Sequence, residues 1–570
     1  MTITIGINAN HADSSICIFE ENKLIFAIEE ERINRIKHWA GVPFESIKLG
    51  IDYCKIKPHQ ISNITLNTNP LSNLNKKIFF YLKNYLFSQK SKEIFYRQKL
   101  KIKIKDQLSK FIGNKDINFH YIDHHLSHIS SAFYPSNFDR AVGISIDGFG
   151  DFCSCVIAQC EKSQIKIIDK IFFPNSIGVF YEAMTQLIGF RKYGEEYKMM
   201  GLSSYGSPKF KSLLKKNLFV NQNLFQLNTK FFNHTDRNFK YLFSGSPEQN
   251  SIFNKNIFKL LNINEEDLKN HDLKCDLASS AQFIFEEFLQ SIMHRCQKKK
   301  FSNNLVYAGG CALNSLANKK LFDHFENVFI PYAPGDSGGS IGSALTLLSK
   351  KYKNFLNINT PYIGPRYSES DIYSSINNFK FSKNVIQKKF ENKNTFLDEI
   401  VKLLMANKVI GLFNNEMEFG ARALGNRSII ASPISIEMKD IINKKIKKRE
   451  NFRPFAPAIL EEEKHNWFHS SRSNPYMSNV EYVIEDKRNK IPAVTHFDGT
   501  GRVQSVSKTA NLNFYEIINK FYQNTGVPIL LNTSFNENEP IVLEPKQALS
   551  CFDRTDMDAI ILSKFIILRN

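Results

Sequence analysis

Three glycine-rich segments, each directly after a short apolar stretch, constrain the fold of this chain more than any other feature of the sequence. They are Asp147–Gly150, Gly309–Gly310 and Gly335–Gly339. Because glycine has no side chain, backbone N–H groups in such turns can approach a phosphate closely, and a following helix N-terminus adds positive potential. None has the spacing of a Walker loop or a Gly-x-Gly-x-x-Gly turn. Their recurrence among short strands still favours an α/β scaffold that binds a nucleotide or phosphate.

The hydrophobic pattern divides the chain into two expected domains, 1–355 and 366–570, with insertions near 72–110 and 207–270 in the first. The stretch between them is polar and carries two prolines and a glycine, as is typical of a domain boundary. In the first domain, apolar runs predict strands at 2–7, 14–19, 23–29, 61–66, 117–122, 141–146, 155–158, 165–173, 305–307 and 328–330, and helices at 179–190 and 277–298. In the second, they predict helices at 395–406 and 439–449 and strands at 409–413, 527–536 and 559–567.

Composition narrows the class of protein. With 42% hydrophobic and 23% charged residues the chain is globular, and no run of about 20 apolar residues predicts a membrane-spanning helix. The N-terminus lacks the basic region of a signal peptide, and the nine cysteines are scattered, so a cytoplasmic location is expected. The net charge of +19 comes from dispersed lysines, so we expect no nucleic-acid partner; anionic small molecules would use the same positive field.

The segment Leu74–Lys105 is aromatic and basic and contains no glycine. It fits an amphipathic helix pair at an anionic membrane surface. It also fits a helical insertion whose lysines face solvent, and this second interpretation is favoured.

Three histidines within five positions predict a metal site. If a helix continues through residues 129–133, His124 and His128 project from one face, and His125 points off it. Asp147, just past an apolar strand, is a candidate third ligand, and Asp336 a fourth. Two imidazoles and two carboxylates suit a catalytic iron or zinc ion. The alternative is a pair of core histidines.

The second domain carries a different set of charged residues with polar companions. The charged residues are Arg422, Arg427, Lys447, Arg453 and Arg502, and the companions are Asn426, Asn443, Gln504, Asn532 and Asn536. Arginine guanidinium groups bind phosphate through two parallel hydrogen bonds. Glycine, proline, alanine and phenylalanine surround several of these residues, which is not typical of a solvated face. The sequence therefore favours an anion pocket over scattered surface arginines.

Motifs along nearly the whole chain resemble those of O-carbamoyltransferases of the nodulation-protein and cephamycin type, a family that includes the enzyme that carbamoylates tobramycin. In order, they are GINANHADSS, EEERINRIKH, HHLSHISSAF, IDGFGD, YKMMGLSSYG, AGGCALNS, GDSGGSIGSA, FGARALGNRS, KKRENFRPFAPA and LNTSFN. The resemblance implies an N-terminal domain of the actin-like ATPase fold (ribonuclease H-like, two-lobed) and a C-terminal YrdC-like α/β domain.

The resemblance also implies a reaction and residue roles. The C-terminal domain would make carbamoyl-adenylate from carbamoyl phosphate and ATP, and the N-terminal domain would transfer the carbamoyl group to an acceptor hydroxyl beside a metal ion. That ion would be Fe(II) or another divalent metal, and Mg²⁺ can accompany ATP.

His11 would be the general base. The implied metal ligands are His124, His128, Asp147 and Asp336. The implied adenylate-lining residues are Gly178, Lys198, Gly201, Gly310 and Asn314. The implied carbamoyl phosphate and ATP ligands are Arg422, Lys447, Arg453, Arg502 and Asn532.

The predicted function is therefore ATP-dependent O-carbamoyl transfer to a hydroxyl of a sugar or natural product. Two alternatives stay open at this point: a tRNA threonylcarbamoyl-transfer protein and a non-enzymatic actin-like ATP-binding regulator. The expected partner is a hydroxylated small molecule or glycan, and the sequence leaves a homo-oligomer open. It does not identify the acceptor.

Overall fold

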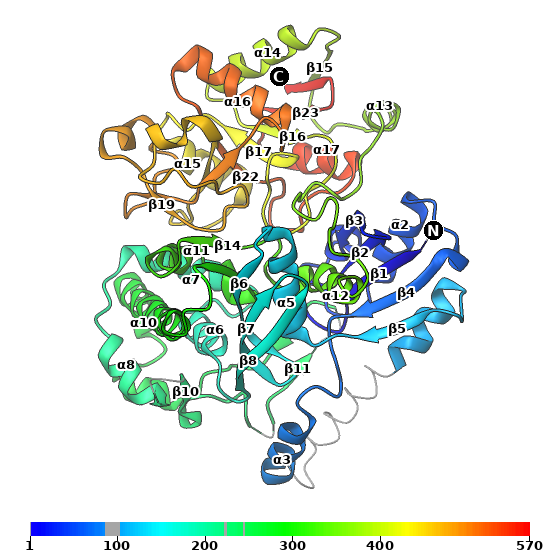
Figure 1. Ribbon diagram of the computed structural model, residues 1–570. Helices are drawn as coiled ribbons and strands as arrows, with labels where there is room; N and C mark the ends of the chain where they lie inside the picture. The colour runs from blue at the N-terminus through cyan, green and yellow to red at the C-terminus, as the bar shows by residue number, and fades with distance from the viewer. Residues whose placement is uncertain (1, 86–102, 222–224, 237, 243–244) are drawn as a thin grey trace. The chain divides into compact units, whose positions relative to one another are not determined.

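The computed structural model describes residues 2–85, 103–221, 225–236, 238–242 and 245–570 (Figure 1). The chain forms two compact units, Met1–Asn359 and Thr360–Asn570. The division falls inside the polar stretch 352–365. Across the described ranges, no helix is long and apolar enough to cross a bilayer. Of the predicted helix pair at 74–105, residues 86–102 lie outside the described residues.

The first unit begins with a five-stranded sheet in the order β3-β2-β1-β4-β5. Strands β1–β2 and β2–β3 pair antiparallel, whereas β1–β4 and β4–β5 pair parallel. All of β1 is buried, although isoleucine alternates along it with Thr4, Gly6 and Asn8, so both faces of this strand are covered. The strands are β1 (Ile3–Asn8), β2 (Ser15–Glu20), β3 (Lys23–Glu29), β4 (Ile61–Leu66) and β5 (Asn118–Tyr121).

A second five-stranded sheet in the same unit has the order β8-β7-β6-β13-β14. Its strands are β6 (Arg140–Gly150), β7 (Cys153–Glu161), β8 (Gln164–Phe172), β13 (Asn304–Ala308) and β14 (Asn327–Phe329). Here β6–β7 and β7–β8 are antiparallel, and β6–β13 and β13–β14 are parallel. Each sheet is thus an antiparallel meander with two parallel strands added beside its first strand. This repeated topology agrees with the predicted two-lobed, ribonuclease H-like arrangement.

Two helices that carry site residues, α5 (His124–Phe133) and α12 (Gly339–Leu348), pack against each other. The approach is very close, because a Cβ added at Gly342 would lie 1.8 Å from the carbonyl oxygen of Ser127. A Cβ at Gly338 would lie 1.9 Å from the carbonyl oxygen of Ala333. Close packing therefore requires glycine at Gly338 and Gly342. The sequence analysis had explained the glycines of this region only by the approach of a phosphate to the backbone.

Capping side chains set the helix ends in the first unit. The helix predicted at 179–190 is α6 (Ile177–Leu187), which begins earlier because Ser176 Oγ accepts a hydrogen bond from Val179 N. The helix predicted at 277–298 is α10 (His271–Lys298), which begins earlier because the side chain of Asn270 accepts from two backbone N–H groups. The region 207–270 forms α8 (Lys211–Leu218), α9 (Asn256–Leu261) and short strand pairs outside both sheets.

The second unit is built on an eight-stranded mixed sheet, in the order β15-β24-β23-β16-β17-β22-β18-β21. Its strands are β15 (Val385–Lys389), β16 (Ile410–Phe413), β17 (Arg427–Ala431), β18 (Ala456–Leu460), β21 (Gln504–Val506), β22 (Ile529–Ser534), β23 (Ala559–Leu562) and β24 (Phe565–Arg569). Helices α14 (Lys393–Met405), α16 (Leu512–Thr525) and α17 (Pro545–Arg554) contribute buried apolar residues to the core around this sheet. The unit is α/β, as predicted, and its YrdC-like character stays a prediction.

Two sequence predictions in this unit are wrong. The single basic helix predicted at 439–449 is α15 (Met438–Ile442) followed by a π-helical turn, Asn443–Lys447, which ends at Lys448 in a left-handed conformation, φ 43°. The single closing strand predicted at 559–567 is the hairpin β23–β24, because the chain reverses at Ser563, φ 53°.

Candidate functional site

Helix α5 aims two histidines in one direction. The carboxylate of Asp123 caps its N-terminus by accepting hydrogen bonds from the backbone N–H groups of His125 and Leu126. His124 and His128, one turn apart, are both buried. A second carboxylate, Asp151, accepts a hydrogen bond from His124 N at 3.0 Å. The start of the helix is therefore fixed by two acidic side chains.

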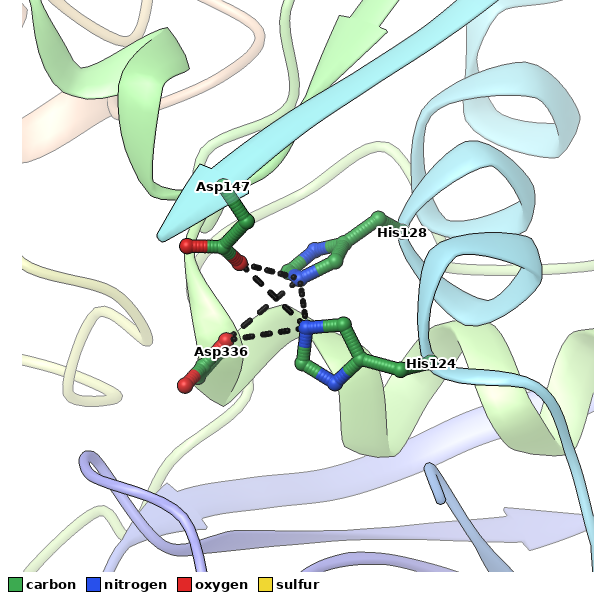
Figure 2. A group of neighbouring side chains, drawn as sticks. All are labelled: His124, His128, Asp147 and Asp336. Atoms are coloured by element: carbon green, nitrogen blue, oxygen red, sulfur yellow. Dashed lines mark hydrogen bonds and ion pairs between the residues drawn. The ribbon is translucent and has the colours of Figure 1, made fainter. Parts of the chain in front are cut away.

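The structure brings together the four residues that the sequence predicted as metal ligands (Figure 2). Asp147 comes from β6 and Asp336 from the short turn before α12. Asp147 Oδ2 lies 3.3 Å from His124 Nε2 and 3.1 Å from His128 Nε2. Asp336 Oδ1 lies 3.5 Å and 3.4 Å from the same two nitrogen atoms. The two nitrogens are themselves 3.1 Å apart.

These separations fit a metal site. Two atoms that bind one ion at about 2.0–2.2 Å lie roughly 3.0–3.5 Å apart in tetrahedral or octahedral geometry. Asp336 Oδ1 is buried without a hydrogen-bond partner among the described residues, as are the Nδ1 atoms of both histidines. A buried carboxylate oxygen that faces two imidazole nitrogens, with no other partner, is the donor set that a divalent cation satisfies.

The pKa shifts of three of these groups, His128, Asp147 and Asp336, support the same conclusion. Burial opposes the charged form of His128, but Asp147 and Asp336 outweigh burial and raise the pKa of this imidazole to about 9. Burial and the nearby Asp147 raise the pKa of Asp336. Burial would also raise the pKa of Asp147, yet its hydrogen bonds to the histidines lower it well below its usual value. The site thus attracts positive charge, which a divalent ion would supply in place of a proton.

His11 lies beside this group. It follows β1, and its Nδ1 atom is 3.9 Å from Asp336 Oδ2. Its ring stacks on that of His124, with centroids 5.0 Å apart. The loop that carries His11 is held by Asn8, whose amide donates to the carbonyl oxygens of Ala12 and Asp13 at 3.0 and 2.9 Å. The predicted general base is therefore adjacent to the predicted metal ligands.

His125 points away from the site, as the sequence predicted. Its Nδ1 atom lies 2.8 Å from Ser145 Oγ, and its Nε2 atom lies 3.0 Å from the carbonyl oxygen of Cys153. Burial lowers the pKa of this imidazole to about 4. A neutral His125 therefore ties α5 to β6 and β7.

The predicted adenylate-lining glycines divide into two groups. Gly178 and Gly310 lie at the end of β6: their added Cβ atoms would be 3.0 Å from Asp147 O and 2.9 Å from Asp147 Oδ1, respectively. A side chain at Gly310 would crowd the carboxylate of Asp147, and one at Gly178 would crowd the backbone of Asp147 and Gly148. Gly201 instead lies inside α7 (Glu196–Leu202).

Two polar residues predicted at the same subsite have partners within the chain. Lys198 Nζ forms an ion pair with Glu195 at 2.8 Å. Asn314 caps the helix that follows it by accepting from Ala317 N, and exchanges hydrogen bonds with Gln282. A role for either residue in binding adenylate stays a prediction.

The sequence missed an ion pair beside His11. His38 Nδ1 lies 2.8 Å from Asp13 Oδ1, and His38 N donates to Glu31 at 2.8 Å. Burial alone would raise the pKa of Asp13 and lower that of His38, but their attraction reverses both shifts. Both residues belong to motifs quoted above, so a search for complementary charges between motifs could have found them.

A group of carboxyl and phenol side chains near Asp336 was also missed. The rings of Tyr193 and Tyr241 are 6.4 Å apart, and both interact electrostatically with Asp336 and Glu182. Burial and the nearby Glu196 raise the pKa of Glu182 to about 8. These residues come from separate segments with no shared spacing, so no signal in the sequence joined them.

In the second unit, four arginines approach one another, namely Arg422, Arg449, Arg453 and Arg502. Burial, followed by repulsion from the other three, lowers the pKa of Arg502 well below its usual value. Burial lowers the pKa of Arg422 to about 10. Arg502 Nε is buried without a hydrogen-bond partner among the described residues. Such a concentration of partly buried positive charge fits an anion of high charge. The sequence missed Arg449, although it lies between two predicted ligands.

Two other predicted anion ligands are occupied by the chain itself. Lys447 Nζ donates to the carbonyl oxygens of Ser534 and Asn536 at 2.6 and 2.8 Å, and to the side chain of Asn536. Asn532 Nδ2 donates to Gln504 Oε1 at 2.7 Å. In this structure, these residues join β22 to its neighbours, and their contact with a phosphate stays a prediction.

Comparison with known proteins gives the family. A family model described as "Carbamoyltransferase N-terminus" matches residues 3–345, and one described as "Carbamoyltransferase C-terminus" matches residues 401–569. The chain belongs to the carbamoyltransferase family. The predicted resemblance and the prediction of a carbamoyltransferase enzyme are thereby confirmed.

Relatives extend over most of the chain. Nodulation protein NolNO of Sinorhizobium fredii is 31% identical over 97% of this chain and 78% of its own length. Uncharacterized protein sll1178 of Synechocystis is 31% identical over 100% of this chain and 97% of its own. Among solved structures, HypF of T. kodakarensis aligns at 14% identity and a TM-score of 0.32, over 61% of this chain and 48% of that chain. At this score the alignment does not establish a common fold.

Proposed function

We propose that this carbamoyltransferase is an ATP-dependent O-carbamoyltransferase that activates carbamoyl phosphate in its second unit and transfers the carbamoyl group in its first. The arginine cluster of the second unit is the observation that carries this proposal most directly. Carbamoyl phosphate and ATP together bring several phosphate charges, and bidentate arginine contacts bind such groups strongly. Arg502, with its unpartnered Nε, is the residue most in need of an anion.

Activation yields carbamoyl-adenylate in this scheme. Water cleaves carbamoyl phosphate to carbamate and phosphate, and a carbamate oxygen then attacks the α-phosphorus of ATP with loss of pyrophosphate. The arginines would neutralise the charge that develops on the phosphoryl oxygens. The mixed anhydride is reactive, and AMP is a good leaving group for the next step.

Transfer is assigned to the site around His11. The acceptor oxygen bonds to the carbonyl carbon, the carbon–oxygen bond to AMP breaks, and the hydroxyl proton passes to His11. Asp336, 3.9 Å from His11 Nδ1, would orient the ring so that Nε2 accepts this proton. A divalent cation held by His124, His128, Asp147 and Asp336 would polarise the carbamoyl oxygen as a Lewis acid. Fe(II) fits this donor set, and other divalent metals fit it as well.

The family assignment bears on the two alternatives. The match of residues 401–569 to the carbamoyltransferase C-terminal model favours a protein that activates its own carbamoyl donor. This observation disfavours a tRNA threonylcarbamoyl-transfer protein, and a non-enzymatic regulator is inconsistent with membership of an enzyme family.

The test is pyrophosphate release by the purified full chain, supplied with ATP, carbamoyl phosphate and a divalent metal. We expect release that requires both substrates and that rises when a hydroxylated acceptor is added. Absence of carbamoyl-phosphate-dependent release with every metal and acceptor tried would exclude the proposal.

A further inference from the structure

Helix α3 (Leu74–Tyr85) presents an apolar face to solvent, the reverse of an ordinary surface helix. The large hydrophobic residues exposed on and just before it are Leu71 (71%), Leu74 (41%), Ile78 (47%), Phe79 (69%) and Leu82 (57%). At 100° per residue, Leu74, Ile78 and Leu82 form one continuous stripe, because they are four residues apart. Figure 1 shows that α3 lies at the periphery of its unit.

The opposite face of α3 holds it on the protein. The ring of Phe80 lies 5.0 Å from that of Phe173 and 5.7 Å from that of Phe152. Tyr81 also contacts Phe152, with ring centroids 5.9 Å apart. Lys77 is buried, and its Nζ donates to the carbonyl oxygen of Pro70 at 3.1 Å. The outward apolar stripe is therefore not a core face that has failed to pack.

The charge around the stripe indicates what covers it. Residues 71–85 contain three lysines and no acidic residue. Lys83 is exposed at the edge of the apolar face, where a long side chain can reach anionic headgroups. Lys76 is exposed as well, and its Nζ lies 5.6 Å from the centroid of the Phe172 ring. The wider sequence 74–105 carries ten Lys or Arg and one Glu, so the segment as a whole is strongly basic. Apolar side chains flanked by cations on one helix match an anionic lipid interface better than an uncharged protein groove.

We propose that α3 is a membrane-surface anchor, which lies parallel to an anionic lipid surface and inserts Leu74, Ile78, Phe79 and Leu82 among the acyl chains. The anchor is peripheral, since α3 has only 12 residues and a membrane-spanning helix needs about 20. It is independent of the transfer chemistry, because no residue of α3 belongs to the candidate site.

The experiment is co-sedimentation of the full chain with vesicles of phosphatidylcholine alone and of phosphatidylcholine with about one-third phosphatidylglycerol. The wild type is expected to bind the anionic vesicles preferentially and to be partly released by high salt. The variant Ile78→Gln/Leu82→Gln is expected to bind at least about tenfold more weakly, since two inserted side chains are lost. Leu213→Gln is the matched control, because Leu213 is an exposed leucine on another helix of the same unit, α8.

All three proteins have the same net charge, so the comparison separates insertion from simple attraction of a chain with charge +19. Equal binding by the wild type and the double variant would overturn the proposal, as would no binding by the wild type. Concentration-dependent self-association that the double variant abolishes would assign the stripe to a second copy of the chain and would also overturn it. If the double variant unfolds, Phe79→Gln replaces it, since Phe79 is 69% exposed and its removal leaves no cavity.

Discussion

Gly150 offers a direct test of the candidate metal site, because it lies against the imidazole of His124. A Cβ added at Gly150 would lie 1.9 Å from His124 Cδ2, whereas an ordinary contact needs about 3.4 Å. In Gly150→Ala, the ring or the strand must therefore move by about 1.5 Å, the difference between the two distances. His124 is 1% exposed, so no free space receives the displaced ring.

The displacement is large compared with what metal coordination tolerates. Ligand distances in metal sites hold within about 0.2 Å, so Gly150→Ala removes His124 as a ligand. We expect the affinity for Fe²⁺ or Zn²⁺ to fall at least about 100-fold. Loss of a residue that only supports a ligand typically lowers metal affinity about 10–100-fold, and loss of a ligand should cost at least as much. The assay is competition with a chelator of known affinity, using metal-free wild type and variant.

The matched control is Gly148→Ala, in the same strand, β6, where an added Cβ has no atom within 4 Å. It is expected to bind metal like the wild type. Wild-type affinity in a Gly150→Ala protein that is still folded, as verified by a cooperative unfolding transition, would refute the reasoning that His124 is a ligand.

Three further predictions concern other parts of the molecule. Arg502→Ala is expected to lower pyrophosphate release from ATP and carbamoyl phosphate at least about 100-fold. Arg502→Lys should restore only part of this rate, because lysine cannot make the bidentate contact. Equal rates in the wild type and both variants would contradict this prediction. The Asp13–His38 pair should stabilise the fold fully between pH 3.8, the ordinary pKa of an aspartate, and pH 6.5, the ordinary pKa of a histidine. Its contribution should be lost as the pH rises through the raised pKa of His38. It should also be lost as the pH falls through the lowered pKa of Asp13. Denaturant titrations should therefore show Asp13→Asn less stable by about 1 kcal/mol near pH 5–6, with a smaller deficit at pH 9; a deficit independent of pH would show that the pair is not responsible. Lys464 Nζ lies 2.8 Å from the carboxylate of Glu481, so Lys464→Met leaves this carboxylate buried without its cation. The variant should reduce the free energy of unfolding by about 3–5 kcal/mol. Adding Glu481→Leu should recover most of that loss in the same titration.

The sequence predicted that His124, His128, Asp147 and Asp336 come together because the local geometry is simple. Two histidines one turn apart share a helix face, and Asp147 follows an apolar run in the sequence, which the structure extends as β6 to Gly150. Asp336 was predicted as a ligand because it is a carboxylate in a glycine-rich segment, and the structure places it with the other three residues. These features depend on periodicity and strand ends, which a single sequence displays.

Other features depend on contacts between distant segments and could not be predicted. The two sheets of the first unit share strand order and direction, but their residues show no repeat, since topology constrains burial and not residue identity. The predicted basic helix changes to a π-helical turn where Lys447 turns inward to the oxygen atoms of Ser534 and Asn536. The Tyr193–Tyr241 contact likewise joins segments with no common pattern.

Activation and transfer are assigned to different residues in different units. Carbamoyl-phosphate-dependent exchange of labelled pyrophosphate into ATP tests this assignment most directly, because exchange reports reversible formation of the adenylate and needs no acceptor. We predict that His11→Ala exchanges pyrophosphate at the wild-type rate and that Arg502→Ala does not exchange it. Loss of exchange in His11→Ala, or wild-type exchange in Arg502→Ala, would contradict the assignment of the two steps.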